Sequence, residues 1–172
     1  MPTNIEIKAR IEDWDRLRRV AAELSDRPVE IIDQLDTFFA CPRGRLKLRY
    51  LSPERGELII YEREDRPDSK ASRYLITATA EPDQLREVLT RAFGVVGTVR
   101  KRRYLYIVGQ TRIHLDEIVE LGKFLELEVV LRQDQPSAEG EKIAADLMEK
   151  LGVKRKHLIA GAYVDMMAAQ MR

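Results

Sequence analysis

The sequence of 172 residues contains little cysteine, no long apolar run and almost no excess charge of either sign. Its single cysteine, Cys41, excludes an internal disulfide and favours a reducing compartment. Cys41 precedes Pro42 in an expected turn, so we do not interpret it as a nucleophile. No stretch resembles a signal peptide or approaches the roughly 20 apolar residues of a membrane span. We therefore expect a soluble cytoplasmic protein with no membrane partner.

The balance of charge gives no indication of a polyanionic macromolecule as a partner. Lys and Arg number 30 against 29 Asp and Glu, and we expect no nucleic-acid partner. Charged residues nevertheless make up 34% of the chain, which is more than the usual quarter. The local arrangement of charge must therefore indicate the function. The length, without linker, repeat or low-complexity tract, predicts a single domain over residues 1–172.

Helices are predicted in four places where apolar residues recur with helical spacing. Asp13 is a suitable N-cap for the first of them. Two polar segments, residues 62–72 and 132–141, are expected to be loops, the first of them mobile. The expected helices cover residues 14–24, 85–93, 143–151 and 163–171.

Between the helices the spacing of apolar residues falls to two, which is typical of strands. Short turns join most of these segments, so most of the strands should be antiparallel. The expected strands cover residues 4–10, 34–39, 45–51, 57–63, 73–79, 99–108, 111–118 and 123–131.

Five of these strands have one apolar face and one face of ordered charge. In "NIEIKAR" (4–10), Asn4, Glu6, Lys8 and Arg10 alternate with apolar residues, so they share a face of the strand. The same pattern recurs at Arg45, Lys47 and Arg49, at Lys101 and Arg103, at Arg112, His114 and Asp116, and at Glu126 and Glu128.

Two arrangements of the sheet fit this pattern. An open sheet would leave the charged face in water, and each strand taken singly is compatible with that. Taken together, the rows favour closure, because a solvated face usually scatters Ser, Thr, Gln, Lys and Glu, whereas these rows hold paired Arg and Lys. We therefore predict an α+β protein whose sheet closes into a barrel, with helices on the apolar outer face and charge in the lumen.

Such a lumen needs a ligand, because burying unpaired charge costs several kcal/mol. The inward bases need a multivalent anion, and Arg and Lys both recognise phosphate oxygens. The acids Glu6, Glu126 and Glu128 would repel that anion unless a cation lies between. Carboxylate and phosphate oxygens are the usual ligands of Mg²⁺ and Mn²⁺. Together the two rows predict a small-molecule triphosphate bound with a divalent metal.

Six segments in sequence order, "EIK", "QLDTFF", "LKLR", "KRR", "RIHLD" and "LGKFLELEV", resemble the CYTH superfamily, also called triphosphate tunnel metalloenzymes. The resemblance runs from residue 4 to about 166 and implies an eight-stranded antiparallel β-barrel that processes a triphosphate with divalent metal. The segments "DTFF", "GRLKLR" and "RIHLD" are most similar to the class IV adenylate cyclase branch.

The resemblance also implies roles for individual residues. The implied metal ligands are Asn4, Glu6, Glu126 and Glu128. The implied triphosphate-binding bases are Lys8, Arg10, Lys47, Arg49, Lys101, Arg103 and Arg112. Arg63 and Lys70 could close over the substrate, and His114 is either an auxiliary phosphate donor or a satisfied barrel histidine. Lys8, Arg112 and Asp116 are the expected catalytic residues, Asp116 as an acid near the metals.

The sequence departs from the family motif ExExK, because Asn4 occupies its first acidic position. An amide oxygen can still coordinate a metal but brings no charge. Family members that hydrolyse triphosphate are expected to use a second metal, so this change disfavours two-metal hydrolysis.

Three functions remain open at this point. They are an adenylate cyclase that forms cyclic AMP and pyrophosphate, a triphosphatase acting on tripolyphosphate, thiamine triphosphate or a nucleotide, and a non-catalytic binding module. A homodimer is compatible with each of them.

Overall fold

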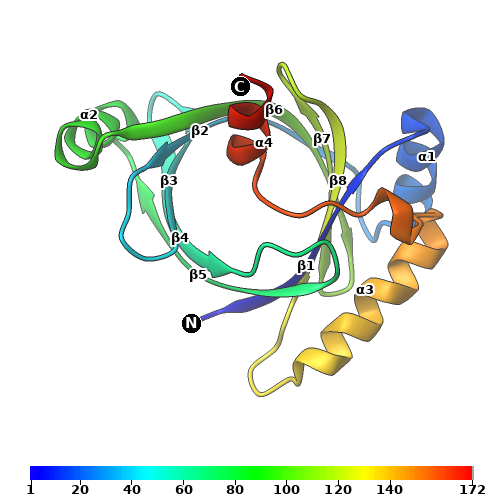
Figure 1. Ribbon diagram of the computed structural model, residues 1–172. Helices are drawn as coiled ribbons and strands as arrows, with labels where there is room; N and C mark the ends of the chain where they lie inside the picture. The colour runs from blue at the N-terminus through cyan, green and yellow to red at the C-terminus, as the bar shows by residue number, and fades with distance from the viewer. Residues whose placement is uncertain (172) are drawn as a thin grey trace.

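The computed structural model describes residues 1–171, and in them the chain forms one closed barrel of eight antiparallel strands (Figure 1). Around the barrel the strands follow the order β1-β5-β4-β3-β2-β6-β7-β8, and β8 pairs with β1. This arrangement confirms the predicted fold class. The strands are β1 (Thr3–Arg10), β2 (Glu30–Phe39), β3 (Arg45–Ser52), β4 (Arg55–Arg63), β5 (Lys70–Thr79), β6 (Val95–Val108), β7 (Thr111–Ile118) and β8 (Gly122–Val130).

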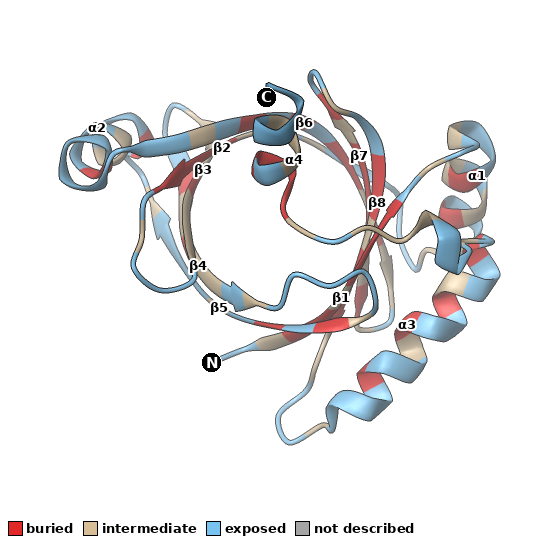
Figure 2. Cartoon of the chain, viewed as in Figure 1, coloured by how far each residue is buried: buried red, intermediate tan, exposed pale blue. Residues whose placement is uncertain are grey.

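The main core lies outside the barrel wall, where α1 (Trp14–Leu24) and α3 (Ser137–Leu151) pack side by side (Figure 1). The apolar rows of β1, β6, β7 and β8 point outward and meet these helices. Because one face of these strands meets the helices and the other lines the lumen, the strands are buried on both sides, as Figure 2 shows for β1, β7 and β8.

Two further helices lie at other places on the barrel. α2 (Pro82–Phe93) covers the outer face of β3 and β4 through Leu85 and Leu89. α4 (Tyr163–Gln170) lies across one end of the barrel, where Tyr163 packs with Phe38, Val99 and Phe124 (Figure 1). One end of the lumen is thus closed by an apolar cluster. Among residues 1–171, none of the helices has the length and apolar character needed to cross a membrane.

Several elements are longer than the sequence predicts. β2, β5 and β6 begin three or four residues earlier, and the expected loop over residues 62–72 shrinks because β4 reaches Arg63 and β5 starts at Lys70. α3 begins at Ser137, so much of the expected loop 132–141 is helical. The reason is Gly140, which lies in the helix where a Cβ would be 2.6 Å from side-chain atoms of Ile5 and Leu131. The glycine permits close packing of α3 on β1 and does not mark a loop.

Closure of the barrel is uneven along β5. β1 pairs with β5 only through the register Thr3↔Arg73 to Glu6↔Lys70. β4, on the other side, pairs with β5 from Ser72 to Thr79. The second half of β5 therefore has a neighbouring strand on one side only within residues 1–171.

Candidate functional site

The lumen is a cavity of about 660 Å³ lined by side chains from all eight strands. Period-two alternation directs one row of each strand inward, as the sequence predicts. The bases and acids expected to point inward all line the cavity, namely Glu6, Lys8, Lys47, Arg49, Lys101, Arg103, Arg112, Glu126 and Glu128. Asn4, Arg63 and His114 line it as well.

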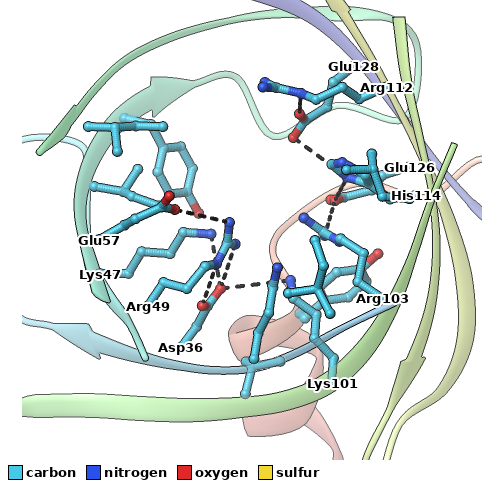
Figure 3. Close-up of a pocket in the computed structure, with 18 of the residues that line it drawn as sticks. Asp36, Lys47, Arg49, Glu57, Lys101, Arg103, Arg112, His114, Glu126 and Glu128 are labelled. Carbon is cyan, nitrogen blue, oxygen red and sulfur yellow. Dashed lines mark hydrogen bonds and ion pairs between the residues drawn. The ribbon is translucent and has the colours of Figure 1, made fainter. Parts of the chain in front are cut away.

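One wall of the lumen carries three cations around one carboxylate; we call Asp36, Lys47, Arg49 and Lys101 the Asp36 cluster (Figure 3). Arg49 Nε and Nη2 donate to the two Asp36 oxygens at 2.9 and 3.0 Å. The ammonium nitrogens of Lys47 and Lys101 lie 3.1 and 3.7 Å from Asp36 Oδ2. Asp36 itself is 1% exposed.

The pKa values of this cluster reflect an excess of positive charge. Burial alone would raise the pKa of the Asp36 carboxyl, but Arg49, Lys47 and Lys101 hold it well below its usual range. Burial and the nearby Arg103 guanidinium lower the pKa of Lys101 to about 7. One carboxylate thus does not balance three cations, and the cluster favours an additional anion.

The opposite wall carries acids, and Figure 3 shows His114, Glu126 and Glu128 there. Together with Glu6, which also lines the lumen, we call them the carboxylate cluster. Each acid is held by a base. Arg63 Nη1 lies 2.9 Å from Glu6 Oε2, and Arg112 Nε lies 2.9 Å from Glu128 Oε2. Glu126 is contacted by Lys8 at 3.3 Å and by Arg103 at 3.2 Å.

The carboxylate cluster has the groups needed to hold a divalent cation. Ligand atoms of His114, Glu126 and Glu128 lie within 4.8 Å of one another. Burial and Arg103 lower the pKa of His114, so its imidazole is neutral near pH 7 and its nitrogens can act as ligands. His114 Nδ1 and Asn4 Oδ1 are both buried without a hydrogen-bond partner in residues 1–171. The unpartnered His114 nitrogen beside two carboxylates fits a bound metal, and the unpartnered Asn4 oxygen lines the same lumen.

Glu6 differs from the other acids of this cluster. Burial and the neighbouring Glu128 raise its pKa, in spite of the ion pair with Arg63. Glu6 lies directly opposite Glu128 across the β1–β8 ladder. The crowding of acids at this point is relieved by any cation that binds between them.

Asp116 does not line the cavity, although the sequence predicts an acid near the metals there. It is 0% exposed and accepts two hydrogen bonds of 2.8 Å from Arg103 Nε and Nη2. The Asp116 carboxylate therefore fixes the direction in which Arg103 enters the lumen.

Arg10 lies outside the cavity, contrary to its predicted place beside the phosphates. It is the last residue of β1, exposed, and its guanidinium lies 5.6 Å from the Phe124 ring centre at the end of the barrel covered by α4. Lys70 is buried outside the cavity lining, and its ammonium group donates to the Arg66 carbonyl at 2.9 Å.

Sequence reasoning missed three groups that hold the bases in place. Asp36 shares the inward parity of Gln34 and Phe38 on β2, so alternation could have identified it. Tyr163 places its ring 3.8 Å from the Lys8 ammonium and 5.2 Å from that of Lys101. The Gly161 carbonyl accepts from Lys8 at 2.9 Å and from Arg63 at 3.2 Å. No local signal places this C-terminal segment in the barrel.

Comparison with known proteins agrees with this geometry. The CYTH domain model matches residues 2–163. The PH1012 protein of Pyrococcus horikoshii is 26% identical, with a TM-score of 0.83 over 94% of this chain and 98% of that one. A candidate adenylate cyclase from Vibrio parahaemolyticus is 18% identical, with a TM-score of 0.78 over 96% and 97% of the two chains.

A third similar structure is that of a candidate adenylyl cyclase from Hippeastrum described as having a dominant triphosphatase activity. It is 16% identical, with a TM-score of 0.66 over 98% of this chain and 96% of that one. No curated protein matches the sequence. The family match covers all eight strands of the barrel, and the chain belongs to the CYTH domain family.

Proposed function

We propose that the protein is a divalent-metal-dependent enzyme that binds an organic triphosphate such as ATP in the lumen and converts it to a cyclic nucleotide and pyrophosphate. The observation that carries this proposal is the pairing of a cation-rich wall with a wall of acids across one cavity. A metal–triphosphate is complementary to both walls at once.

Binding of such a ligand exchanges partners within existing ion pairs. Arg112 now pairs with Glu128, and Lys8 pairs with Glu126. Phosphate oxygens would take the bases, which frees the acids for the cation. Lys8 is buried and Glu126 and Glu128 are largely buried before the ligand enters, so the exchange repeats only part of the desolvation cost.

The metal would be held by His114, Glu126 and Glu128, with Asn4 and Glu6 beside them, and the donor set accommodates Mg²⁺ or Mn²⁺. When bound, it supplies polarisation of the α-phosphate and a lower pKa for the attacking 3′-hydroxyl. Lys47, Arg49 and Lys101 would hold the β- and γ-phosphates and stabilise the charge that develops on the leaving pyrophosphate. Arg103, directed by Asp116, enters the lumen between the two walls.

Apolar side chains in the same lumen favour an organic substrate. Ile32, Leu51, Ile59, Ile76 and Leu105 line the cavity alongside the charged groups. Tripolyphosphate has no apolar part to contact them, whereas a nucleotide carries a base and a sugar. A cavity of about 660 Å³ is within the usual range for small-molecule sites.

A triphosphatase is the second candidate, because the Hippeastrum structure is described with that activity. The three groups His114, Glu126 and Glu128 form a single compact cluster, and Glu6 is engaged by Arg63. Asn4 occupies an acidic position of the family motif, so the site favours one metal over two. Because hydrolysis is expected to use a second metal, this favours cyclisation.

The test is incubation of the protein with Mn²⁺ and, in turn, ATP, thiamine triphosphate and tripolyphosphate, followed by chromatographic identification of products. Cyclic AMP with pyrophosphate supports the proposal, and orthophosphate supports the triphosphatase. Saturable binding without turnover of any substrate would identify a binding module and contradict both. The lumen variant Lys47→Met serves as the control for contaminating activity, since it removes a cation of the Asp36 cluster.

A further inference from the structure

Gln34 is a buried amide of the lumen whose carbonyl oxygen lacks a partner. The side chain lines the cavity and the residue is 5% exposed. Its Oε1 atom is buried and has no hydrogen-bond partner within residues 1–171. An unpaired buried acceptor costs free energy, so the position calls for a donor from outside the described chain.

The position of Gln34 along β2 determines which part of a ligand can reach it. Phe38 packs with Tyr163 at the end of the barrel that α4 covers. From that end the inward row of β2 continues through Asp36 and Gln34 to Ile32, with about 6.6 Å between successive members. Gln34 therefore lies between a carboxylate that gathers three cations and an apolar side chain.

The neighbouring strand β6 shows the same change from charged to apolar side chains. Lys101 lies directly opposite Gln34 in the β2–β6 ladder, and its ammonium nitrogen lies 3.7 Å from Asp36 Oδ2. Two inward positions farther from α4, β6 carries Leu105, which also lines the cavity. Gln34 is thus at the boundary between the cations of the Asp36 cluster and the apolar part of the lumen.

A triphosphate ester bound by the Asp36 cluster brings the first atoms of its organic part to this boundary. Because α4 covers the lumen behind the cations, the organic part extends toward Ile32 and Leu105. The terminal torsion of a glutamine is broad, so Oε1 can turn toward the lumen at small cost. An amide oxygen accepts a hydrogen bond, and the hydroxyl groups of a sugar can donate one.

We propose that Gln34 makes the site specific for triphosphates of a hydroxylated sugar, with a sugar hydroxyl donating to Gln34 Oε1. The inference rests on the proposed function, because it requires a triphosphate in the lumen. It narrows the substrate to nucleoside triphosphates, since neither thiamine triphosphate nor tripolyphosphate has a sugar hydroxyl. Gln34 determines specificity and takes no part in the cleavage of a bond.

Calorimetry tests this by comparing ATP, 2′,3′-dideoxy-ATP and tripolyphosphate, with Ca²⁺ in place of Mn²⁺ to limit turnover. The wild-type chain should bind ATP about tenfold more tightly than the dideoxy nucleotide, as expected for one neutral hydrogen bond. Gln34→Met keeps the length of the side chain but removes the acceptor, so it should lose most of this preference. Its affinity for tripolyphosphate should stay within about twofold, because that ligand has no hydroxyl to lose a bond.

Two controls separate specificity from folding. Ser72→Ala changes another neutral polar residue, which is 2% exposed and lines the lumen from β5, and it should leave the preference for ATP unchanged. The melting temperature of ligand-free Gln34→Met should equal or exceed that of the wild type, because the variant removes an unpaired buried acceptor. A purely structural role for Gln34 predicts the opposite result, a lower melting temperature with an unchanged preference for ATP.

Equal binding of ATP and the dideoxy nucleotide by the wild-type chain overturns the inference and leaves the metal–triphosphate site in place. A preference for ATP that survives in Gln34→Met assigns the hydroxyl contact to another residue and overturns the inference as well. If none of the three triphosphates binds, with Ca²⁺ or with Mn²⁺, the proposed function fails and the inference fails with it.

Discussion

The two walls of the lumen bury their charges in different ways. In the Asp36 cluster three cations share one carboxylate, and burial together with the nearby Arg103 lowers the pKa of Lys101. In the carboxylate cluster each acid is paired with a base, and burial together with the neighbouring Glu128 raises the pKa of Glu6. The first wall can therefore bind an anion without losing an ion pair. In the second wall, the acids can bind a cation only when their bases move to another partner.

The largest effect is expected from removing the single carboxylate of the first wall. Asp36→Asn leaves Lys47, Arg49 and Lys101 without their common anion, and loss of one partner from a buried ion pair costs about 3–5 kcal/mol. Urea unfolding measures the change. Added tripolyphosphate should recover part of the lost stability, because it supplies negative charge to the same cations.

A matched control lies on the same strand. Asp33 also forms a two-bond pair with an arginine, Arg102, but both side chains are exposed, so Asp33→Asn should change stability little. Equal destabilisation by the two variants would show that burial of the Asp36 ion pairs does not increase their contribution to stability.

The next largest effect concerns the second wall. Glu128→Gln removes one charged ligand from the group of His114, Glu126 and Glu128 and should lower Mn²⁺-dependent turnover at least about 100-fold. The rise in melting temperature on adding Mn²⁺ should disappear as well. Glu117→Gln is the control, because Glu117 lies on β7 and does not line the lumen. Unchanged turnover in Glu128→Gln would show that Glu128 of β8 does not contribute to the active site.

A smaller effect is expected in the pH dependence of binding. The pKa of Lys101 is about 7 in the free protein, below its ordinary 10.5, so the free amine is largely neutral at pH 8. A bound polyanion favours the charged form, so binding takes up a proton, and affinity should fall by up to about tenfold for each pH unit above 7.

Calorimetry at pH 8 in two buffers of different ionisation enthalpy measures this proton uptake. Lys101→Arg keeps the positive charge at all these pH values and should abolish the uptake while retaining binding. The same uptake in Lys101→Arg would assign the proton to another group.

The smallest effect is expected at Asn4, beside the carboxylate cluster. Asn4→Glu places a second acid on β1 near Glu6 and should destabilise the metal-free barrel by about 1 kcal/mol. With saturating Mn²⁺ the change should vanish or reverse, and hydrolysis of tripolyphosphate should rise relative to cyclisation. Thermal melts and phosphate release measure both, with Asn4→Gln as the uncharged control. No change in either would place Asn4 outside the metal site.

Much of the lumen follows from the sequence because strand alternation is a local property. In β1, β3, β6, β7 and β8 most of the charged rows line the lumen, and the exceptions besides Arg10 are Arg45 and Asp116. The prediction fails at Arg10 because β1 ends there, and alternation does not indicate where the lumen ends. The prediction of an eight-stranded closed barrel depended on the resemblance to a family, because an open sheet would show the same alternation of charged and apolar residues.

The partners of the charged side chains were not accessible from the sequence. That Asp36 meets Arg49 depends on the register Asp36↔Arg49 between β2 and β3, and its contact with Lys101 depends on β6. Asp116 faces Arg103 for the same reason, through the register of β6 with β7. The position of Tyr163 follows from how α4 packs across the barrel, which no single segment encodes.

The Gly161 carbonyl, which binds both Lys8 and Arg63, has a consequence for conformational entropy. Long basic side chains lose up to about 2 kcal/mol of rotamer freedom when they are fixed. Here both are already fixed in the folded chain, so a ligand meets cations that no longer have this freedom to lose. In a chain shortened to end before Gly161, Lys8 and Arg63 would be fixed only when the ligand binds. Calorimetry would measure the difference as a less favourable entropy of association.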